Sequence, residues 1–432
     1  MSRAQRRLEG MPVSRTRWLV VFAIQALTVL SVVPWRTGDL YAGGIDPVVA
    51  AKAVIGVSAL GLAVLYWLRS PVRGSVGFRT VALFLGIVLV SVVGAFATDN
   101  AGPDVVLAVR LVLVAATIQF IVLSVPHLTA LTTMLSAMGV VAIIAAVTGA
   151  SSALGGGRLA GGIPQMAPNV LAGLAAAPAI GLAVHIIARG LRPWNVALLV
   201  LLFALVLATG SRTSLIVIVL GIVLAFVVGG RVPISTTIAT IAIFPFAYGL
   251  VAFTDTVAKA LSRGQSIEEI STLSSRTVAW QAVFATPFDS WPKWIGVGLA
   301  AQTVAVQQRW RDVQVLDSSW VSVIAQAGII GTLLLIIWTV TTGADSLRSL
   351  RLTAITTPLF LMLVLRSFTE NGLIESSPTF VVFFTVSLVL ERQRQVQDRV
   401  GSKLRYAVAV PLPRRRRTLS PSLSVDDPAG SG

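Results

Sequence analysis

Arginines that stand among hydroxyl groups in an otherwise apolar chain are the residues of this sequence best suited to chemistry. Arg212 lies in Thr209-Gly210-Ser211-Arg212-Thr213-Ser214, a tight turn between two apolar stretches. Arg158 precedes a glycine-rich stretch that ends at Pro168-Asn169, and Arg366 stands near the end of another apolar stretch. An arginine inside a bilayer costs roughly 2.5 to 3.5 kcal/mol, so each of these is a candidate for binding an anionic group. Near a helix end, an arginine can instead extend its head group to water.

The segment from about 255 to 317 is the one long connection between apolar stretches, and it mixes cations with tryptophans. Ser274 precedes a helical pattern through Trp280 and Phe284, so we expect short helices in this loop. The tryptophans suit an interfacial aromatic belt. With the cations they also suit an anionic, sugar-bearing lipid, because aromatic faces cover the apolar side of a pyranose while guanidinium groups bind phosphate. The residues concerned are Lys259, Arg263, Arg276, Lys293, Arg309, Arg311, Trp280, Trp291, Trp294 and Trp310.

The elements that must position these residues follow from composition. The chain has 432 residues, of which 55% are hydrophobic and only 12% charged. Such a chain is solvated by a bilayer, and a span needs about 20 apolar residues. The sequence predicts an all-α polytopic membrane protein of about twelve spans, near 18–34, 46–68, 77–97, 104–125, 127–149, 167–188, 194–209, 211–229, 232–254, 318–342, 353–368 and 374–391.

Charge predicts the orientation of these spans, because lysine and arginine in short segments stay on the cytoplasmic side. Both ends of the chain are basic, and an even number of spans places both in the cytoplasm. The predicted organisation is a basic cytoplasmic amino end at 1–17, nine spans over 18–254, the large extracytoplasmic loop at 255–317, three spans over 318–391, and a disordered basic cytoplasmic tail at 392–432. The location expected is the cell membrane.

Several kinds of site are disfavoured. The chain has no cysteine, which removes disulfides and thiolate metal sites, and its two histidines are too far apart in sequence to suggest a ligand pair. We therefore expect no metal site built from thiolates or from a histidine pair, and no cofactor. The net charge of +16 reports membrane topology and attraction to anionic membrane lipids, because no compact basic domain with interleaved aromatics is present. We expect no nucleic-acid partner.

Five short motifs, taken in order, resemble the O-antigen ligase and polysaccharide polymerase superfamily of membrane glycosyltransferases. They run from about 158 to 331, and each is weak alone. Their order and spacing, with the large loop before the last spans, carry the resemblance. The motifs are Ala167-Pro168-Asn169, the Thr209–Ser214 turn, Ser275-Arg276 with Trp280 four residues on, Gly296-Val297-Gly298, and Asp317-Ser318-Ser319-Trp320 leading into Ala327-Gly328-Ile329-Ile330-Gly331.

The resemblance implies a metal-independent, inverting glycosyltransferase. Such an enzyme moves a glycan from a polyprenyl diphosphate donor, such as undecaprenyl diphosphate, to a glycan or lipid acceptor on the outer face of the membrane, in cell-surface polysaccharide assembly. By the same resemblance Arg212 and Arg276 hold the diphosphate. Further substrate contacts are expected from Arg158, Asn169, Trp280, Arg366, Glu370 and Glu375.

Asp317 is the candidate general base. An acceptor hydroxyl must lose a proton as it attacks the anomeric carbon, and a positioned carboxylate can take that proton. Many members of the superfamily have a histidine at this place, so the departure leaves both the base and the choice between ligase and polymerase open. Asp317 can equally be a helix N-cap. Glu370 or Glu375 is then the next candidate base.

A twelve-helix transporter or flippase of a lipid-linked or anionic substrate is the alternative function. Such proteins contain two similar halves with broken helices at mid-membrane. We find no such repeat in the sequence, and the long loop occurs once.

Overall fold

A computed structural model of the protein describes residues 14–36, 47–70, 77–99, 101–155, 157–229, 274–308, 311–349 and 352–409. For 274–277, 306–308, 311–312 and 396–409 only the backbone is described. The helices are α2 (Arg15–Val32), α3 (Pro47–Arg69), α4 (Arg79–Ala97), α5 (Ala101–Ser124), α6 (His127–Thr148), α7 (Ala150–Leu154), α8 (Pro168–Arg189), α9 (Pro193–Ala208), α10 (Arg212–Gly229), α14 (Ser274–Phe284), α15 (Trp291–Ile295), α16 (Ser319–Arg348), α17 (Thr353–Ser367) and α18 (Pro378–Ala409). The strands are β1 (Thr303–Gln308) and β2 (Arg311–Val315).

Helices occupy every expected span that falls within the described residues, whereas the expected span at 232–254 lies outside them. Seven of the helices, namely α2, α3, α4, α5, α6, α8 and α16, are long and apolar enough to cross a membrane by length and composition. Helices α9, α10 and α17 are apolar but shorter. The chain is a helical membrane protein.

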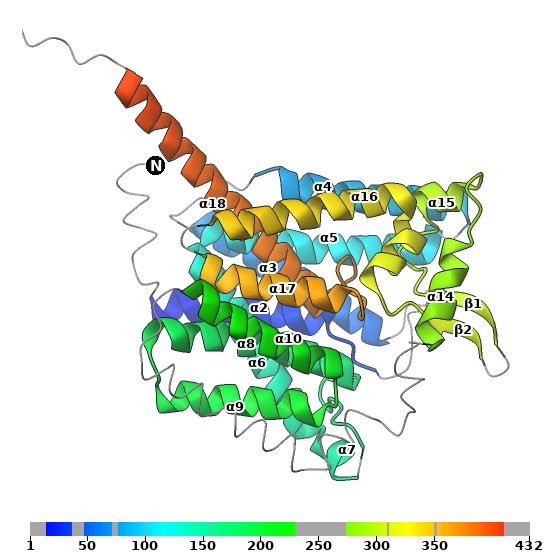
Figure 1. The fold of residues 1–432 in the computed structure, drawn as a ribbon, viewed down its shortest axis with the longest axis horizontal. Helices are drawn as coiled ribbons and strands as arrows, with labels where there is room; N and C mark the ends of the chain where they lie inside the picture. Colours follow the sequence, from blue (N-terminus) through cyan, green and yellow to red (C-terminus); the bar gives the residue numbers. More distant parts are fainter. Residues whose placement is uncertain are drawn as a thin grey trace, which may run out of the picture.

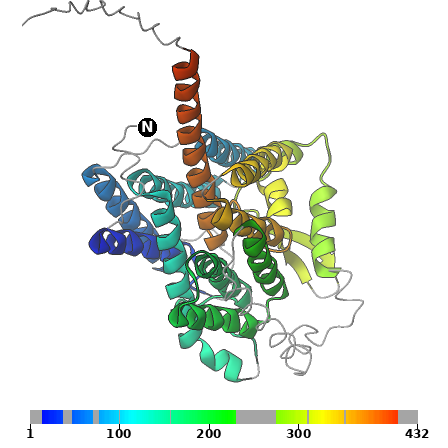
Figure 2. The ribbon, with the colours of Figure 1, turned by 60° about the vertical axis from the view of Figure 1, so that its left-hand side comes forward.

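The long helices lie side by side, with α14, α15 and the two strands gathered at one end of the bundle (Figure 1). Helix α4 packs on α16, α10 contacts both α8 and α17, α3 contacts α5, and α2 contacts α6. We call the end that holds α14 and α15 the site end. The opposite end, where α18 leaves the bundle in Figure 2, we call the ionic end.

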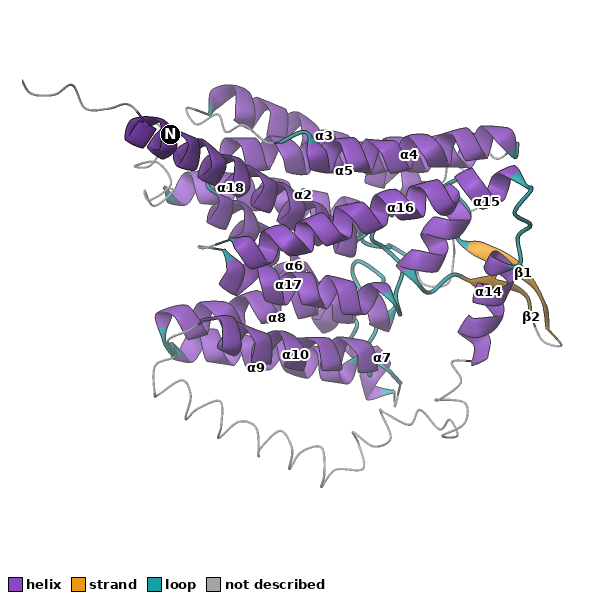
Figure 3. Cartoon of the chain, turned by 45° about the horizontal axis from the view of Figure 1, so that its top comes forward, coloured by secondary structure: helices purple, strands orange, loops and turns teal. Residues whose placement is uncertain are grey.

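The described part of the loop, 274–308 and 311–317, contains two short helices, as expected, and also a β-hairpin, which the all-α prediction missed. Strands β1 and β2 are antiparallel, with Thr303 opposite Val315 and Ala305 opposite Val313 (Figure 3). Valines at 304, 306, 313 and 315, a residue type that favours strands, were the available signal. The prediction interpreted this stretch by its aromatic and cationic residues, and so overlooked its valines.

Helix α18 continues to Ala409, so the prediction that a disordered tail begins at 392 is wrong up to that residue. Residues 410–432 lie outside the described part. Arg392 donates to the carbonyl of Val125 at 2.9 Å, at the C-terminal end of α5. Gln393 accepts a hydrogen bond from Ser349 at 2.8 Å. These contacts hold the first charged turn of α18 inside the bundle, although its sequence reads as a solvated tail.

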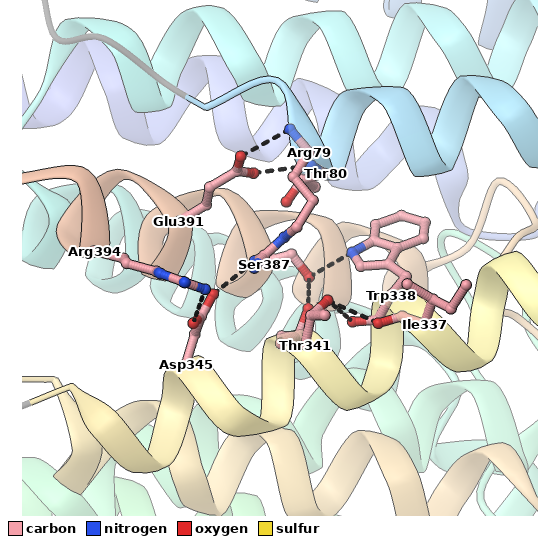
Figure 4. A network of polar contacts seen from close by, with 10 residues as sticks. Arg79, Thr80, Ile337, Trp338, Thr341, Asp345, Ser387, Glu391 and Arg394 are labelled. Carbon is pink, nitrogen blue, oxygen red and sulfur yellow. Dashed lines mark hydrogen bonds and ion pairs between the residues drawn. The ribbon is translucent and has the colours of Figure 1, made fainter. Parts of the chain in front are cut away.

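An ionic network joins α4, α16 and α18 at the ionic end (Figure 4). The buried carboxylate of Asp345 pairs with Arg79 at 2.6 Å and with Arg394 at 3.2 Å. Glu391 accepts from the backbone N–H groups of Arg79 at 2.8 Å and Thr80 at 2.9 Å. A carboxylate at the N-terminus of α4 satisfies donors that the helix leaves open and complements its dipole.

Helix α16 is kinked at Gly328, where φ is 64° and ψ is −162°. The kink frees two carbonyls of the helix, and the loop satisfies both. Val297 donates its N–H to Ala325 at 2.9 Å, and Gly298 donates to Gln326 at 3.0 Å. A positive φ favours glycine. Two motifs of the family resemblance, Gly296-Val297-Gly298 and Ala327-Gly328, are therefore packed against each other as one structural joint.

Candidate functional site

Arg158 joins the glycine-rich stretch to two helix ends. Leu159 donates its N–H to Ala208 at 3.0 Å, which places the preceding residue beside the C-terminus of α9. Arg158 donates from Nε to the carbonyl of Thr209 and from Nη2 to Oδ1 of Asn169, both at 2.7 Å. The carbonyls at a helix C-terminus attract a cation. Arg158 therefore ties the end of α9 to the start of α8.

Arg366 makes a second tie to the same asparagine. Its side chain is buried near the end of α17, where Nη1 donates to the hydroxyl of Ser214 at 2.6 Å and Nη2 to the carbonyl of Asn169 at 3.0 Å. Gly173, one turn along α8, leaves room for the guanidinium, because a Cβ there would lie 2.5 Å from Nη2. Asn169 is thus bonded by two arginines, through its side chain and through its backbone.

Gly173→Ala is expected to destabilise the protein by about 1 to 3 kcal/mol, the usual cost of overpacking. The added methyl group displaces the guanidinium of Arg366 and with it the bonds to α8 and α10. The measurement is the thermal unfolding midpoint of the purified full-length chain. Gly61→Ala in α3 is the matched control, because nothing lies within 4 Å of a Cβ there. Equal midpoints for the two variants would show that Arg366 does not depend on Gly173.

Arg212 differs from the other two arginines. It is the first residue of α10, two residues before Ser214. Its Nε and Nη2 atoms are buried, and neither has a hydrogen-bond partner within the described part of the chain. Leaving a buried donor unbonded costs about 1 to 3 kcal/mol, and more when the group is charged. The guanidinium of Arg212 is therefore suited to an anionic ligand that brings its own acceptors.

The start of α16 is held against the turn after α17. Ser319 donates from its hydroxyl to the carbonyl of Glu370 at 2.9 Å, and Ser318 donates to Ser367 at 3.3 Å. One residue before Glu370, Thr369 donates to the hydroxyl of Thr213 in α10 at 3.3 Å. A chain of contacts therefore links the Arg212 turn to the start of α16, beside Asp317.

Asp317 is not the N-cap of α16. The N-cap residue is Ser318, and its side chain makes no capping bond to the helix. The capping alternative that the sequence left open is wrong by one residue. Asp317 is partly buried at the junction of β2 and α16, next to the site-end turns.

Glu370 and Glu375 lie in different surroundings. Glu370 lies near enough to Arg366 to interact with it electrostatically. Glu375 accepts from Gln326 in α16 at 2.9 Å and from the side chain of Asn371. Burial raises the pKa of Glu375, and these two hydrogen bonds oppose that rise in part. Glu375 is therefore placed with the kink of α16 rather than with the arginines.

Helix α14 supplies Arg276 and Trp280. Trp280 is partly buried against a small apolar cluster of Ala279, Val283, Leu316 and Val321, and its indole nitrogen is buried without a partner among the described residues. Leu316 and Val321 flank the start of α16, so α14 stands beside Asp317. Arg276 lies one turn before Trp280 in α14, and its side chain is outside the described part.

Asp104 is a buried carboxylate that the sequence analysis did not single out. It stands in the first turn of α5 and accepts from the N–H of Leu299, while a Cβ on Gly298 would lie 2.6 Å from its Oδ1. Asp104 thus ties the loop to the bundle. An acidic residue within the predicted first turn of a span, followed far along the chain by Gly-Val-Gly, was too weak a signal to pair them.

No protein-family model matches the chain, and a comparison with curated proteins finds no match either.

Proposed function

We propose that the chain is a membrane glycosyltransferase, either polymerase or ligase, that uses a polyprenyl diphosphate-linked glycan donor and an acceptor hydroxyl in cell-surface polysaccharide assembly. The observation that carries the proposal is the guanidinium of Arg212, whose buried Nε and Nη2 atoms have no hydrogen-bond partner among the described residues. A diphosphate supplies several acceptor oxygens in the geometry that a guanidinium fork prefers.

The surroundings of Arg212 support an anionic ligand. Helices α8, α10 and α16 all begin at the site end, and the N-terminus of a helix carries exposed N–H donors and a partial positive charge. Arg158 and Arg366 add positive charge next to the Thr209–Ser214 turn, although their described hydrogen bonds go to the protein. We assign these two to positioning the Thr209–Ser214 turn, and Arg212 to the ligand.

In the proposed reaction the acceptor oxygen bonds to the anomeric carbon of the donor as the bond from that carbon to the diphosphate oxygen breaks. The proton of the acceptor passes to the carboxylate of Asp317. The bonding electrons leave with the polyprenyl diphosphate, whose added negative charge Arg212 and Arg276 stabilise without moving. One displacement of this kind inverts the anomeric configuration. The turn contacts through Thr213, Thr369 and Ser319 support one shared site.

We further propose that the chain has about twelve spans, with both basic ends in the cytoplasm and the α14–β2 segment outside. The apolar sequence of 232–254, which lies outside the described residues, predicts a further span that makes the count even. The excess of lysine and arginine in the segments assigned to the cytoplasm favours the same orientation. The site end then faces the side on which lipid-linked glycans are polymerised or ligated.

Membrane vesicles of known orientation test both proposals together. Purified lipid-linked glycan donor and acceptor are added to right-side-out and to inverted vesicles that contain the chain, and the extension or transfer of glycan is measured. We expect product in right-side-out vesicles and in detergent. Product in inverted vesicles alone would mean that the orientation is wrong. No product in vesicles or detergent, with donor moving across the bilayer instead, would favour the transporter or flippase.

A further inference from the structure

The loop presents four large aromatic side chains at the surface of the site end. Phe284 is 53% exposed, Phe288 69%, Trp291 72% and Trp294 42%. We call these four residues the aromatic shoulder. The segment that carries them is well ordered by its own bonds, because Trp294 donates from its indole nitrogen to the carbonyl of Phe288 at 2.9 Å. Exposed aromatics held in place, rather than folded inward, indicate a contact surface.

The depth of the shoulder follows from the glycines beneath it. The backbone of Trp294 and Ile295 lies against Gly328, nine residues after the first residue of α16, Ser319. The contact is therefore at the kink of α16, where the helix changes direction. On the other side, a Cβ on Gly94 would lie 2.5 Å from the carbonyl oxygen of Ile295. Helix α15 therefore lies beside the last turn of α4, not beyond its end.

The shoulder continues the apolar surface of two membrane helices. Leu85, Leu89, Val93 and Phe96 form an exposed row along α4, and Ile330, Leu333, Ile337 and Val340 form one along α16. Their spacing of three and four places each row on one face of its helix. Helices α4 and α16 pack on each other, and α15 contacts both at the site end (Figure 1). Lipid that covers those rows is next to the shoulder.

The single lysine of α15, Lys293, does not face outward. Lys293 is 6% exposed, donates from Nζ to the carbonyl of Phe284 at 2.8 Å and lies 4.7 Å from the ring centre of Phe288. The outward side of α15 is thus formed by Trp291 and Trp294. Tryptophan is the residue type that prefers the boundary between headgroups and acyl chains, where its ring is apolar and its N–H is wet.

We propose that the aromatic shoulder is seated in the headgroup region of the membrane leaflet at the site end, so that the segment from Phe284 to Trp294 is anchored to lipid and not suspended in water. This anchoring holds α14 and the start of α16 at the level where the head group of a membrane lipid lies. The proposal does not depend on the chemistry of the site, because it rests on depth, exposure and the adjoining apolar rows.

Spin labels on single cysteines test the proposal, and the parent chain has no cysteine to remove. Full-length Trp291→Cys and Phe288→Cys are labelled and reconstituted in liposomes, with Val313→Cys on β2 as the water-exposed control and Leu333→Cys on α16 as the lipid-facing control. These control positions are each 54% exposed. Collision rates with dissolved oxygen and with a water-soluble nickel chelate are measured for each label.

We expect the labels at 291 and 288 to collide readily with oxygen and, by a factor of about five or more, less often with the chelate than the label at 313, as for a site in the headgroup region. Chelate access equal to that of Val313→Cys would place the shoulder in water and overturn the proposal. Low access to both reagents would mean that protein, such as a second copy of the chain, covers the shoulder, which also overturns it.

Discussion

Arg212→Lys is expected to lower glycan transfer at least 100-fold, which corresponds to about 2.7 kcal/mol of barrier. Insertion of the variant into the membrane and its thermal unfolding midpoint are expected to match those of the parent. Lysine keeps the charge but has one nitrogen where arginine has a planar fork, so it cannot bind two oxygens of a diphosphate in the same way. The substitution removes Nε and Nη2 of Arg212. Neither atom has a hydrogen-bond partner among the described residues, so no described hydrogen bond is broken.

The measurement is turnover of purified protein with saturating acceptor, together with donor binding to the same preparation. Arg69→Lys is the matched control, because Arg69 is exposed at the last residue of α3, on the ionic side. Arg276→Lys is expected to behave like Arg212→Lys, on the strength of the family resemblance. Near-normal transfer by both lysine variants would reduce these arginines to residues that serve topology or packing.

Asp317→Asn is expected to lower turnover by a factor of about 100 or more, because an amide cannot accept the proton of the attacking hydroxyl. Donor binding is expected to persist, since the variant keeps the shape of the side chain and removes a negative charge from the neighbourhood of the diphosphate. The unfolding midpoint is expected to change little, because the N-cap of α16 is Ser318.

Ser318→Ala is the matched control for a purely structural effect at the start of α16. It removes the bond to Ser367 and leaves the carboxylate in place. Turnover by Asp317→Asn at more than about a tenth of the parental rate would exclude the base role. Glu375 would then be examined next, through Glu375→Gln. Since burial raises its pKa, a rate that depends on Glu375 would fall with acidification at a higher pH than for an ordinary carboxylate.

The long apolar helices could be predicted from the sequence because hydropathy is a local property. Predicted boundaries such as 77–97 agree with α4 within a few residues, and Ser274 marks the start of α14 as expected. The sequence misled where a segment carried signals for two different structures. The β-hairpin was hidden by its arginines and Trp310, and the charged turns of α18 resembled a tail because the groups that satisfy them lie elsewhere in the chain.

The sequence alone also identified which arginines are costly in a membrane, but not how each is used. That distinction came from the tertiary structure. The partners of Arg366 are 152 and 197 residues away, on α10 and α8, and Gly173 has no significance until the guanidinium lies against it. In the same way Gly328 pairs with the loop only because α15 packs there. Helix formation depends on neighbours along the chain, whereas the hydrogen bonds that separate a structural arginine from a ligand-binding one join residues that only folding brings together.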